Sequence, residues 1–106
     1  MRYRYDLTPL AVSDIDDALD YISRKLLNQS AADNLYKSIA REITRICDNP
    51  YSFPDCSYYL IDDATTRHCI IGNYVLFFEI SEDKKAIRIL RFLYGRMDIS
   101  NSELIK

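Results

Sequence analysis

The chain has 106 residues and a formal net charge of −2; 48% of its residues are hydrophobic, while Gly and Pro number only 2 and 3. This composition excludes a disordered or fibrous chain, and the length fits a single domain spanning residues 1–106. The apolar runs are only as long as strands, so we expect no segment that crosses a membrane. The N-terminus lacks the apolar stretch of a secretory signal, which leads us to expect a cytoplasmic protein.

Three cysteines and a single histidine restrict the chemistry that the sequence supports. Cys47, Cys56 and Cys69 cannot all pair with one another, and their spacing matches no metal-ligand motif, so we expect buried thiols in a reducing compartment. His68 is the only histidine, and the sequence has no Gly-rich phosphate loop and no nucleophile elbow. We therefore expect no bound metal, no cofactor and no standard hydrolase triad.

The N-terminal segment predicts a strand followed by an amphipathic helix. Residues 3–7 alternate and are rich in aromatic side chains, which is typical of a short strand. Thr8 can cap the free N–H groups of a helix, and Pro9 suits the first helical position. The residues expected on the buried face of this helix recur at spacings of three and four: Val12, Ile15, Leu19, Ile22 and Leu26, with Ala11 and Ala18 beside them.

A second amphipathic helix is predicted after a polar break at residues 28–30. Ser30 and Asp33 resemble a capping arrangement at its start, and Asn49 followed by Pro50 marks its end. The predicted buried stripe consists of Ala32, Leu35, Ile39, Ile43 and Ile46. Two helices joined by so short a turn are expected to pack antiparallel as a hairpin.

The C-terminal half predicts strands that are connected by turns. These span residues 66–71, 74–80 and 86–94, with a further short strand at 58–61 inside a loop and a short helix or tail at 98–106. Helices and strands thus fall in separate runs. This order predicts an α+β fold, in which an N-terminal strand precedes an antiparallel two-helix hairpin packed on a three- to four-stranded, mainly antiparallel sheet.

Arginines interleaved with aromatic residues are the most informative chemical feature of the C-terminal half. Residues 65–106 carry 7 basic and 5 acidic side chains, whereas residues 1–64 carry 7 and 11, so we expect any anion-binding surface in the second half. The arginines are Arg67, Arg88, Arg91 and Arg96, and the aromatic residues near them are Tyr58, Tyr59, Tyr74, Phe77 and Tyr94. Guanidinium groups beside aromatic rings suit RNA, because they bind phosphate while the rings stack on bases.

The face on which each arginine lies bears on this interpretation. Strict alternation would place Ile87, Ile89, Arg91 and Leu93 on one face of the last strand and Arg88, Leu90, Phe92 and Tyr94 on the other. An arginine would then lie on each face. The structural alternative is that Arg91 forms a cross-strand ion pair with a carboxylate such as Glu79.

Several blocks of the sequence resemble the RelE/ParE family of toxins. They are residues 5–11, 14–16, 21–22, 72–78 and 87–98, in the order found in that family. The last block is the most specific, since a strand ends in an aromatic residue that is followed by Gly-Arg-x-Asp. The resemblance covers nearly the whole chain and implies the same strand, hairpin and meander that the residue pattern predicts.

The resemblance implies a toxin that is held inactive by a cognate antitoxin protein. In the RelE-like branch such a toxin cleaves mRNA on the ribosome, and in the ParE-like branch it inhibits DNA gyrase. A third alternative is an inactive homologue that serves only as antitoxin partner or corepressor. A membrane is not among the expected partners.

Carrying the RNase residues over by position implies a catalytic set at three sites. Arg67 and Arg96 match basic residues of the RelE-like branch and would bind the scissile phosphate, stabilising its developing charge. Proton transfer would be carried out by Tyr94, with Glu79 and His68 as alternatives, and a tyrosine needs a lowered pKa for that role.

Two further residues would contact the substrate, and some family positions differ. Arg91 and Tyr74 are expected to bind RNA, although Tyr74 occupies a position where RelE-like members have an arginine. Ser102 stands where they have a late tyrosine, Met97 replaces a frequent arginine, and Tyr94 replaces a histidine. The resemblance therefore implies a nuclease set that is incomplete.

Overall fold

We describe the chain from a computed structural model, which describes residues 2–56 and 66–95. Its elements are β1 (Arg4–Leu7), α1 (Pro9–Asp20), a π-helical turn η1 (Tyr21–Lys25), α2 (Gln29–Asp48), a 3₁₀ turn η2 (Pro50–Ser52), β2 (Thr66–Ile71), β3 (Tyr74–Ser81) and β4 (Ala86–Tyr94). The predicted α+β order is confirmed. The strand expected at 58–61 and the helix or tail expected at 98–106 lie outside the described residues.

The strands form one mixed sheet with the order β1-β4-β3-β2. β2, β3 and β4 are an antiparallel meander, whereas β1 runs parallel to β4 and lies at the edge. One face of the sheet supplies Leu76, Phe78, Ile80, Ile87 and Ile89 to the main core, where they meet the helices. The predicted hairpin on one face of a mainly antiparallel sheet is thus confirmed.

Helix α1 begins as predicted but buries fewer residues than predicted. Thr8 is the N-cap, because its Oγ1 accepts a hydrogen bond of 3.1 Å from the backbone N–H of Ala11, and Pro9 follows at the first position. Val12 and Leu26, expected on the buried face, are 45% and 56% exposed. Val12 faces the space between the helices, and Leu26 follows the π-helical turn, whose i to i+5 bonding breaks the spacing of three and four.

Helix α2 confirms the predicted stripe but starts earlier than predicted. Its N-cap is Asn28, whose Oδ1 accepts a 3.0 Å hydrogen bond from the N–H of Ala31, so Ser30 lies inside the first turn and is not the cap. The preceding Leu27 has a φ of 50°, which reverses the chain and leaves Asn28 placed to cap. Ala32, Ile39, Ile43 and Ile46 are buried and Leu35 packs against the core.

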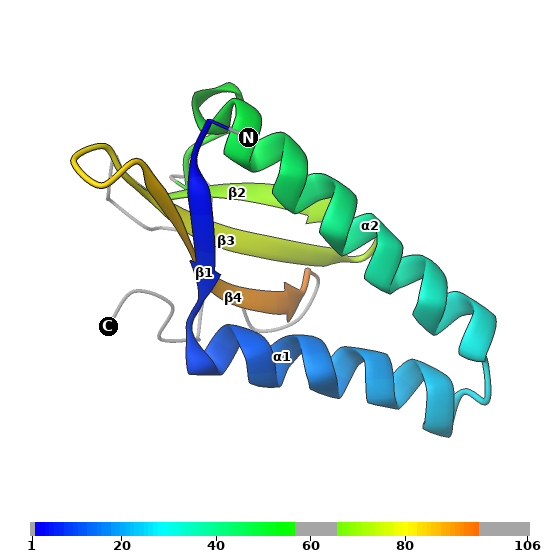
Figure 1. Cartoon of the computed structure of the whole chain (residues 1–106). Coiled ribbons are helices and arrows are strands. Elements are labelled where there is room, and N and C mark those ends of the chain that lie inside the picture. The colour runs from blue at the N-terminus through cyan, green and yellow to red at the C-terminus, as the bar shows by residue number, and fades with distance from the viewer. Residues whose placement is uncertain (1, 57–65, 96–106) are drawn as a thin grey trace.

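The two helices diverge from their connecting turn. Figure 1 shows them joined at one end and spread apart toward β1, which closes the third side. Helix α1 packs mainly on β4, whereas α2 packs on β2 and contacts η1 more extensively than it contacts α1. The hairpin is therefore antiparallel but open. None of the helices in the described ranges is long and apolar enough to cross a membrane.

Candidate functional site

A β-bulge in β4 decides which way the arginines point. Phe77 is opposite Arg91 and Phe78 is opposite Ile89, so Leu90 is an extra residue in β4. Beyond the bulge the faces are exchanged, and Phe92 joins Ile87 and Ile89 in the core on the helix side. The prediction of an arginine on each face is wrong, because the register places the two arginines of β4 on the same face, away from the helices.

Arg91 reaches around the edge of the sheet to an aspartate on α1. Its Nε and Nη2 donate hydrogen bonds of 2.7 and 3.1 Å to the two carboxylate oxygens of Asp14. Both side chains are mostly buried, with 18% and 14% of their surfaces exposed, and the hydrogen bonds and charge of Asp14 raise the pKa of Arg91. The partner considered from the sequence, Glu79, instead lies opposite Arg88. The guanidinium of Arg91, which was predicted to bind RNA, is therefore already bound by both oxygens of Asp14.

Asp14 also completes the backbone hydrogen bonding of β4. β1 pairs with β4 only as far as Ile89, and the described residues supply no neighbouring strand for the rest of that edge. Thr8 Oγ1 donates to the carbonyl of Leu90 at 2.9 Å, and Asp14 Oδ2 accepts from the N–H of Phe92 at 3.0 Å. The start of helix α1 and its N-cap thus supply hydrogen-bond partners to the backbone of β4 where β1 has ended. Asp14 lies in one of the blocks that resemble the RelE/ParE family, but no local pattern indicated its partner, which is 77 residues away.

Tyr74 and Tyr94 lie together at the end of β3 and β4. The ring of Tyr74 stacks on Phe92 at 4.8 Å and meets Tyr94 edge-on at 5.5 Å, and Tyr94 remains 42% exposed. Burial, with smaller contributions from Tyr94 and Tyr21, raises the pKa of Tyr74, so its hydroxyl keeps its proton near neutrality. The pair offers an aromatic surface, and Tyr74 is unsuited to act as a base.

Gly95 follows Tyr94 because the backbone is crowded there. Its N–H donates to the carbonyl of Asn73 at 2.6 Å, and a Cβ at this position would lie 3.1 Å from that carbonyl oxygen and 3.1 Å from Val75 Cγ2. The glycine of the closing block thus permits close packing of the chain against the β2–β3 turn. Arg96, predicted to bind the scissile phosphate, lies outside the described residues.

Arg67 lies at the opposite end of the sheet from Tyr94. Its Nη1 donates to the carbonyl of Phe53 at 2.6 Å, and its guanidinium lies 5.3 Å from the centre of the Tyr51 ring. Its buried Nε has no hydrogen-bond partner among the described residues. Arg67 is opposite Phe78, whereas Tyr94 is opposite Tyr74. These positions on β3 are four residues apart, or about 13 Å along the strand. The structure therefore does not bring Arg67 and Tyr94 together.

The two other candidates for proton transfer lie on the sheet face away from the helices. His68 is buried beside Phe77, and burial lowers its pKa, although nearby Asp55 opposes that shift. A neutral imidazole at pH 7 follows. Glu79 is on the same face by register, whereas Tyr94 and Arg67 belong to the helix side. The alternatives thus cannot share one reaction centre with Tyr94.

A polar cluster that the sequence did not indicate surrounds Glu82 in the β3–β4 turn. Tyr3 and Tyr51 donate hydrogen bonds of 2.8 and 2.7 Å to its Oε2, and Lys85 Nζ lies 2.7 Å from its Oε1. Hydrogen bonds from Lys85, Tyr51 and Tyr3 lower the pKa of Glu82 to about 2. This cluster connects the residue that precedes β1, the turn η2 and the β3–β4 turn, and it keeps Glu82 ionised.

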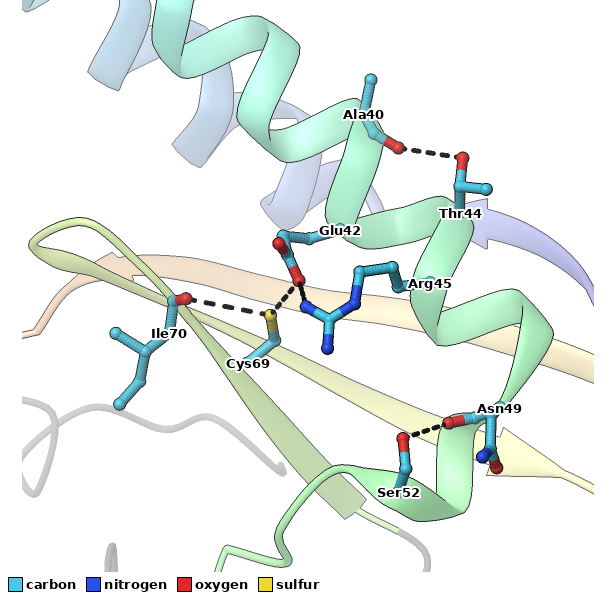
Figure 2. Close-up of polar contacts among 8 residues, drawn as sticks. All are labelled: Ala40, Glu42, Thr44, Arg45, Asn49, Ser52, Cys69 and Ile70. Carbon is cyan, nitrogen blue, oxygen red and sulfur yellow. Dashed lines mark hydrogen bonds and ion pairs between the residues drawn. The ribbon is translucent and has the colours of Figure 1, made fainter.

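The cysteines show no sign of reactivity. Figure 2 shows Glu42 of α2 accepting hydrogen bonds from Arg45 and from Cys69 Sγ on β2, the latter at 3.4 Å. Burial, and then the charge and hydrogen bond of Glu42, raise the pKa of Cys69 to about 12. Cys47 and Cys56 are also buried and belong to no disulfide, which confirms the expected buried thiols. Burial also raises the pKa of Cys47, so the thiols of Cys69 and Cys47 stay protonated and are poor nucleophiles.

Two adjoining hollows lie in the open hairpin. The first, of about 230 Å³, is bounded by β1, α1 and α2 and lined mainly by apolar side chains: Tyr5, Leu7, Val12, Ile15, Ile39 and Ile43. The second, of about 830 Å³, lies closer to the connecting turn and is lined by four aspartates, Asp16, Asp17, Asp20 and Asp33. Asp16 and Tyr36 line both hollows. Together they form the inter-helix groove.

Neither a metal centre nor a catalytic constellation is formed by these groups. In residues 2–56 and 66–95 no three His, Cys, Asp or Glu side chains are placed to hold a metal ion. The features that remain in the described residues are a mixed sheet with an open helical hairpin, the inter-helix groove and an aromatic pair, all within an α+β fold.

Comparison with known proteins identifies the family. The sequence model described as "ParE toxin of type II toxin-antitoxin system, parDE" matches residues 5–99. The chain therefore belongs to the ParE toxin family of type II toxin–antitoxin systems, which confirms the resemblance seen in the sequence. No curated protein matches the chain.

Solved structures share the fold at low sequence identity. A chain of the chromosomal ParDE toxin–antitoxin system from P. aeruginosa superposes with a TM-score of 0.69 and 16% identity, covering 88% of this chain and 96% of that chain. A chain of the RelBE2 toxin–antitoxin complex from Mycobacterium tuberculosis gives a TM-score of 0.49 and 18% identity, covering 89% and 99%. At this identity the first match supports the fold alone.

Proposed function

We propose that this toxin arrests growth by binding its target without breaking a bond, as the ParE-like branch does, with DNA gyrase as that target. The observation that carries the proposal is the separation of Arg67 from Tyr94, two of the three residues expected to cleave RNA. Arg67 and Tyr94 belong to opposite ends of the sheet, and Arg91 is bound by Asp14.

The chemical requirement for cleavage explains why this separation matters. Cleavage of RNA through its 2′-hydroxyl requires a proton acceptor and a cation within hydrogen-bond reach of the same phosphate. Arg67 and Tyr94 lie about 13 Å apart along the strand direction, which exceeds that reach. A target bound through surface contacts has no such requirement.

We propose in addition that an antitoxin keeps the toxin inactive. The solved neighbour from P. aeruginosa is part of a ParDE toxin–antitoxin system. This chain exposes large apolar side chains beside the inter-helix groove, among them Tyr5, Val12 and Tyr36. Apolar surface of this kind is typical of protein interfaces.

Ribosome-dependent mRNA cleavage is the second candidate. It is favoured by the exposed ring of Tyr94 beside Tyr74, since aromatic side chains stack on the bases of single-stranded RNA. In that case Arg96, the next residue but one, would supply the phosphate contact and Tyr94 the proton transfer.

Pulse labelling after induced expression separates these candidates. Incorporation of labelled thymidine and labelled amino acid is followed for the wild-type chain and for Arg96→Ala and Tyr94→Phe. Our proposal predicts that thymidine incorporation falls first and that Tyr94→Phe retains this effect. An immediate stop of protein synthesis that Tyr94→Phe abolishes would support cleavage, and normal growth with a folded wild-type chain would support an inactive homologue.

A further inference from the structure

The two halves of the inter-helix groove differ in chemistry. The half next to β1 is apolar and partly enclosed, with Leu7, Ile15 and Ile39 in its lining. The half next to the connecting turn is polar, and its lining holds four aspartates but only one basic residue, Arg24. A binding partner that fills both halves must therefore be apolar along one part of its length and polar along the other.

The aspartates are not equally available to a partner. Asp20 forms an ion pair of 2.9 Å with Arg24, and Asp33 accepts a 2.9 Å hydrogen bond from Gln29. Asp16 and Asp17 are exposed and have neither an ion pair nor a side-chain hydrogen bond in the described part of the chain. Asp16 lies where the two halves meet, because it lines both hollows. An unpaired negative charge is thus placed at the border of an apolar groove.

The sizes of the hollows favour side chains of a polypeptide over a small molecule. Pockets that enclose a small ligand have volumes of about 300 to 1,000 Å³. The apolar half has only about 230 Å³, and the larger acidic half is open and polar. An amphipathic segment can place a few apolar side chains in the first half while its polar part extends over the second.

From this geometry we infer that the inter-helix groove selects a protein segment that is apolar at its β1 end and carries Lys or Arg where it passes Asp16 and Asp17. This inference rests on the proposed antitoxin partner and adds the chemistry by which the antitoxin is recognised. Complementary charge steers association and rejects partners of like charge. Asp16 and Asp17 are therefore specificity-determining residues, whereas the apolar half supplies most of the affinity.

The test measures antitoxin binding by the full-length chain, using the antitoxin encoded next to this toxin as the probe. Association rate and affinity are compared at low and high salt for the wild type and for the double variant Asp16→Asn/Asp17→Asn. We expect about a threefold to tenfold loss of affinity at low salt, mainly through slower association. The difference should shrink at high salt, because exposed charges are then screened.

Asp83→Asn is the matched control, since Asp83 is an exposed aspartate in the β3–β4 turn and lies outside the groove. It should leave the affinity and its salt dependence unchanged. The inference is overturned if the double variant binds like the wild type at low salt, or if Val12→Arg converts a dimer of the chain alone into monomers, which would assign the groove to a second copy.

Growth arrest separates this inference from the proposed function. Without antitoxin, the double variant should arrest growth as the wild type does, because the groove is assigned to the antitoxin. If the wild type fails to arrest growth but still binds its antitoxin through Asp16 and Asp17, the proposed target is wrong and the inference stands. If the antitoxin does not bind the wild type at all, both are wrong.

Discussion

Each end of the sheet has a carboxylate that accepts hydrogen bonds from several donors, but the arginines at the two ends have different partners. At one end Asp14 accepts two hydrogen bonds from Arg91 and one from the backbone of β4, in a mostly buried setting. At the other end Glu82 accepts from two tyrosines and Lys85 in an exposed cluster, and Arg67 nearby has no carboxylate partner within residues 2–56 and 66–95. At the first end Arg91 is paired within the fold, whereas at the second end Arg67 has no counter-charge in the part of the chain that the structure describes.

This difference shows that an arginine on a strand does not indicate RNA binding by itself. Arg91 and Arg67 look alike in the sequence, as basic residues among aromatic ones. The structure gives Arg91 a bidentate partner that is close to neutralising it, and gives Arg67 only a carbonyl and a ring face. Of the two, only Arg67 retains an uncompensated positive charge among the described residues.

The largest expected effect comes from removing the buried carboxylate. Asp14→Ala leaves the guanidinium of Arg91 unpaired and the N–H of Phe92 without an acceptor. Loss of a buried pair costs about 3 to 5 kcal/mol, and partial exposure here reduces the expected loss of unfolding free energy to about 2 to 3 kcal/mol. Urea unfolding followed by circular dichroism measures it.

Two further variants show whether that loss comes from the ion pair. Asp83→Ala removes an exposed aspartate and should change the unfolding free energy by less than about 0.5 kcal/mol. In Asp14→Ala/Arg91→Met no charge is left unpaired, so the double variant should be more stable than Asp14→Ala alone. A double variant that is less stable than Asp14→Ala would contradict the account of this end of the sheet.

A smaller change in unfolding free energy is expected for substitution of Arg67 than for substitution of Asp14. Arg67→Met loses the ring contact with Tyr51 and the hydrogen bond to Phe53, but it also removes a buried N–H that has no partner. These terms oppose each other, so the unfolding free energy should change by no more than about 1 kcal/mol. Equal losses for Arg67→Met and Asp14→Ala would show that the two ends do not differ.

The smallest effect concerns pH and the exposed cluster around Glu82. Its pKa of about 2 in the folded chain lies below the ordinary value of 4.5, so the unfolded chain takes up this proton first as the pH falls. The contribution of Glu82 to stability is therefore present above about pH 4.5 and lost between about pH 4.5 and 2. The stability difference between wild type and Glu82→Gln should narrow across this window in unfolding experiments, and a constant difference would refute it.

The elements of the fold could be predicted because their signals are local. The Thr8 cap, the Pro9 start, the stripe from Ala32 to Ile46 and the stop at Asn49 each depend on neighbours along the chain, and each is confirmed. The cap of α2 was misplaced because Ser30 and Asn28 are both good caps, and the backbone conformation of Leu27 decides between them.

The arrangement of the site could not be predicted, because it depends on tertiary contacts. The bulge at Leu90 exchanges the faces of β4 beyond that residue. A prediction from strict alternation assumes that no such extra residue is present. Asp14 and Glu82 receive their partners across the fold, from residues 77 and 79 positions away. The site residues predicted from the resemblance thus stay predictions, and the separation of Arg67 from Tyr94 became visible only from the strand register.

The central claim is that this toxin binds its target and does not cleave RNA, and two reactions with the purified wild-type chain test it most directly. One follows supercoiling of relaxed plasmid by DNA gyrase, and the other follows ribosome-bound mRNA by primer extension. We predict that supercoiling is inhibited while the mRNA stays intact. Cleavage of the mRNA with unimpaired supercoiling would contradict the claim and assign Arg96 and Tyr94 to catalysis.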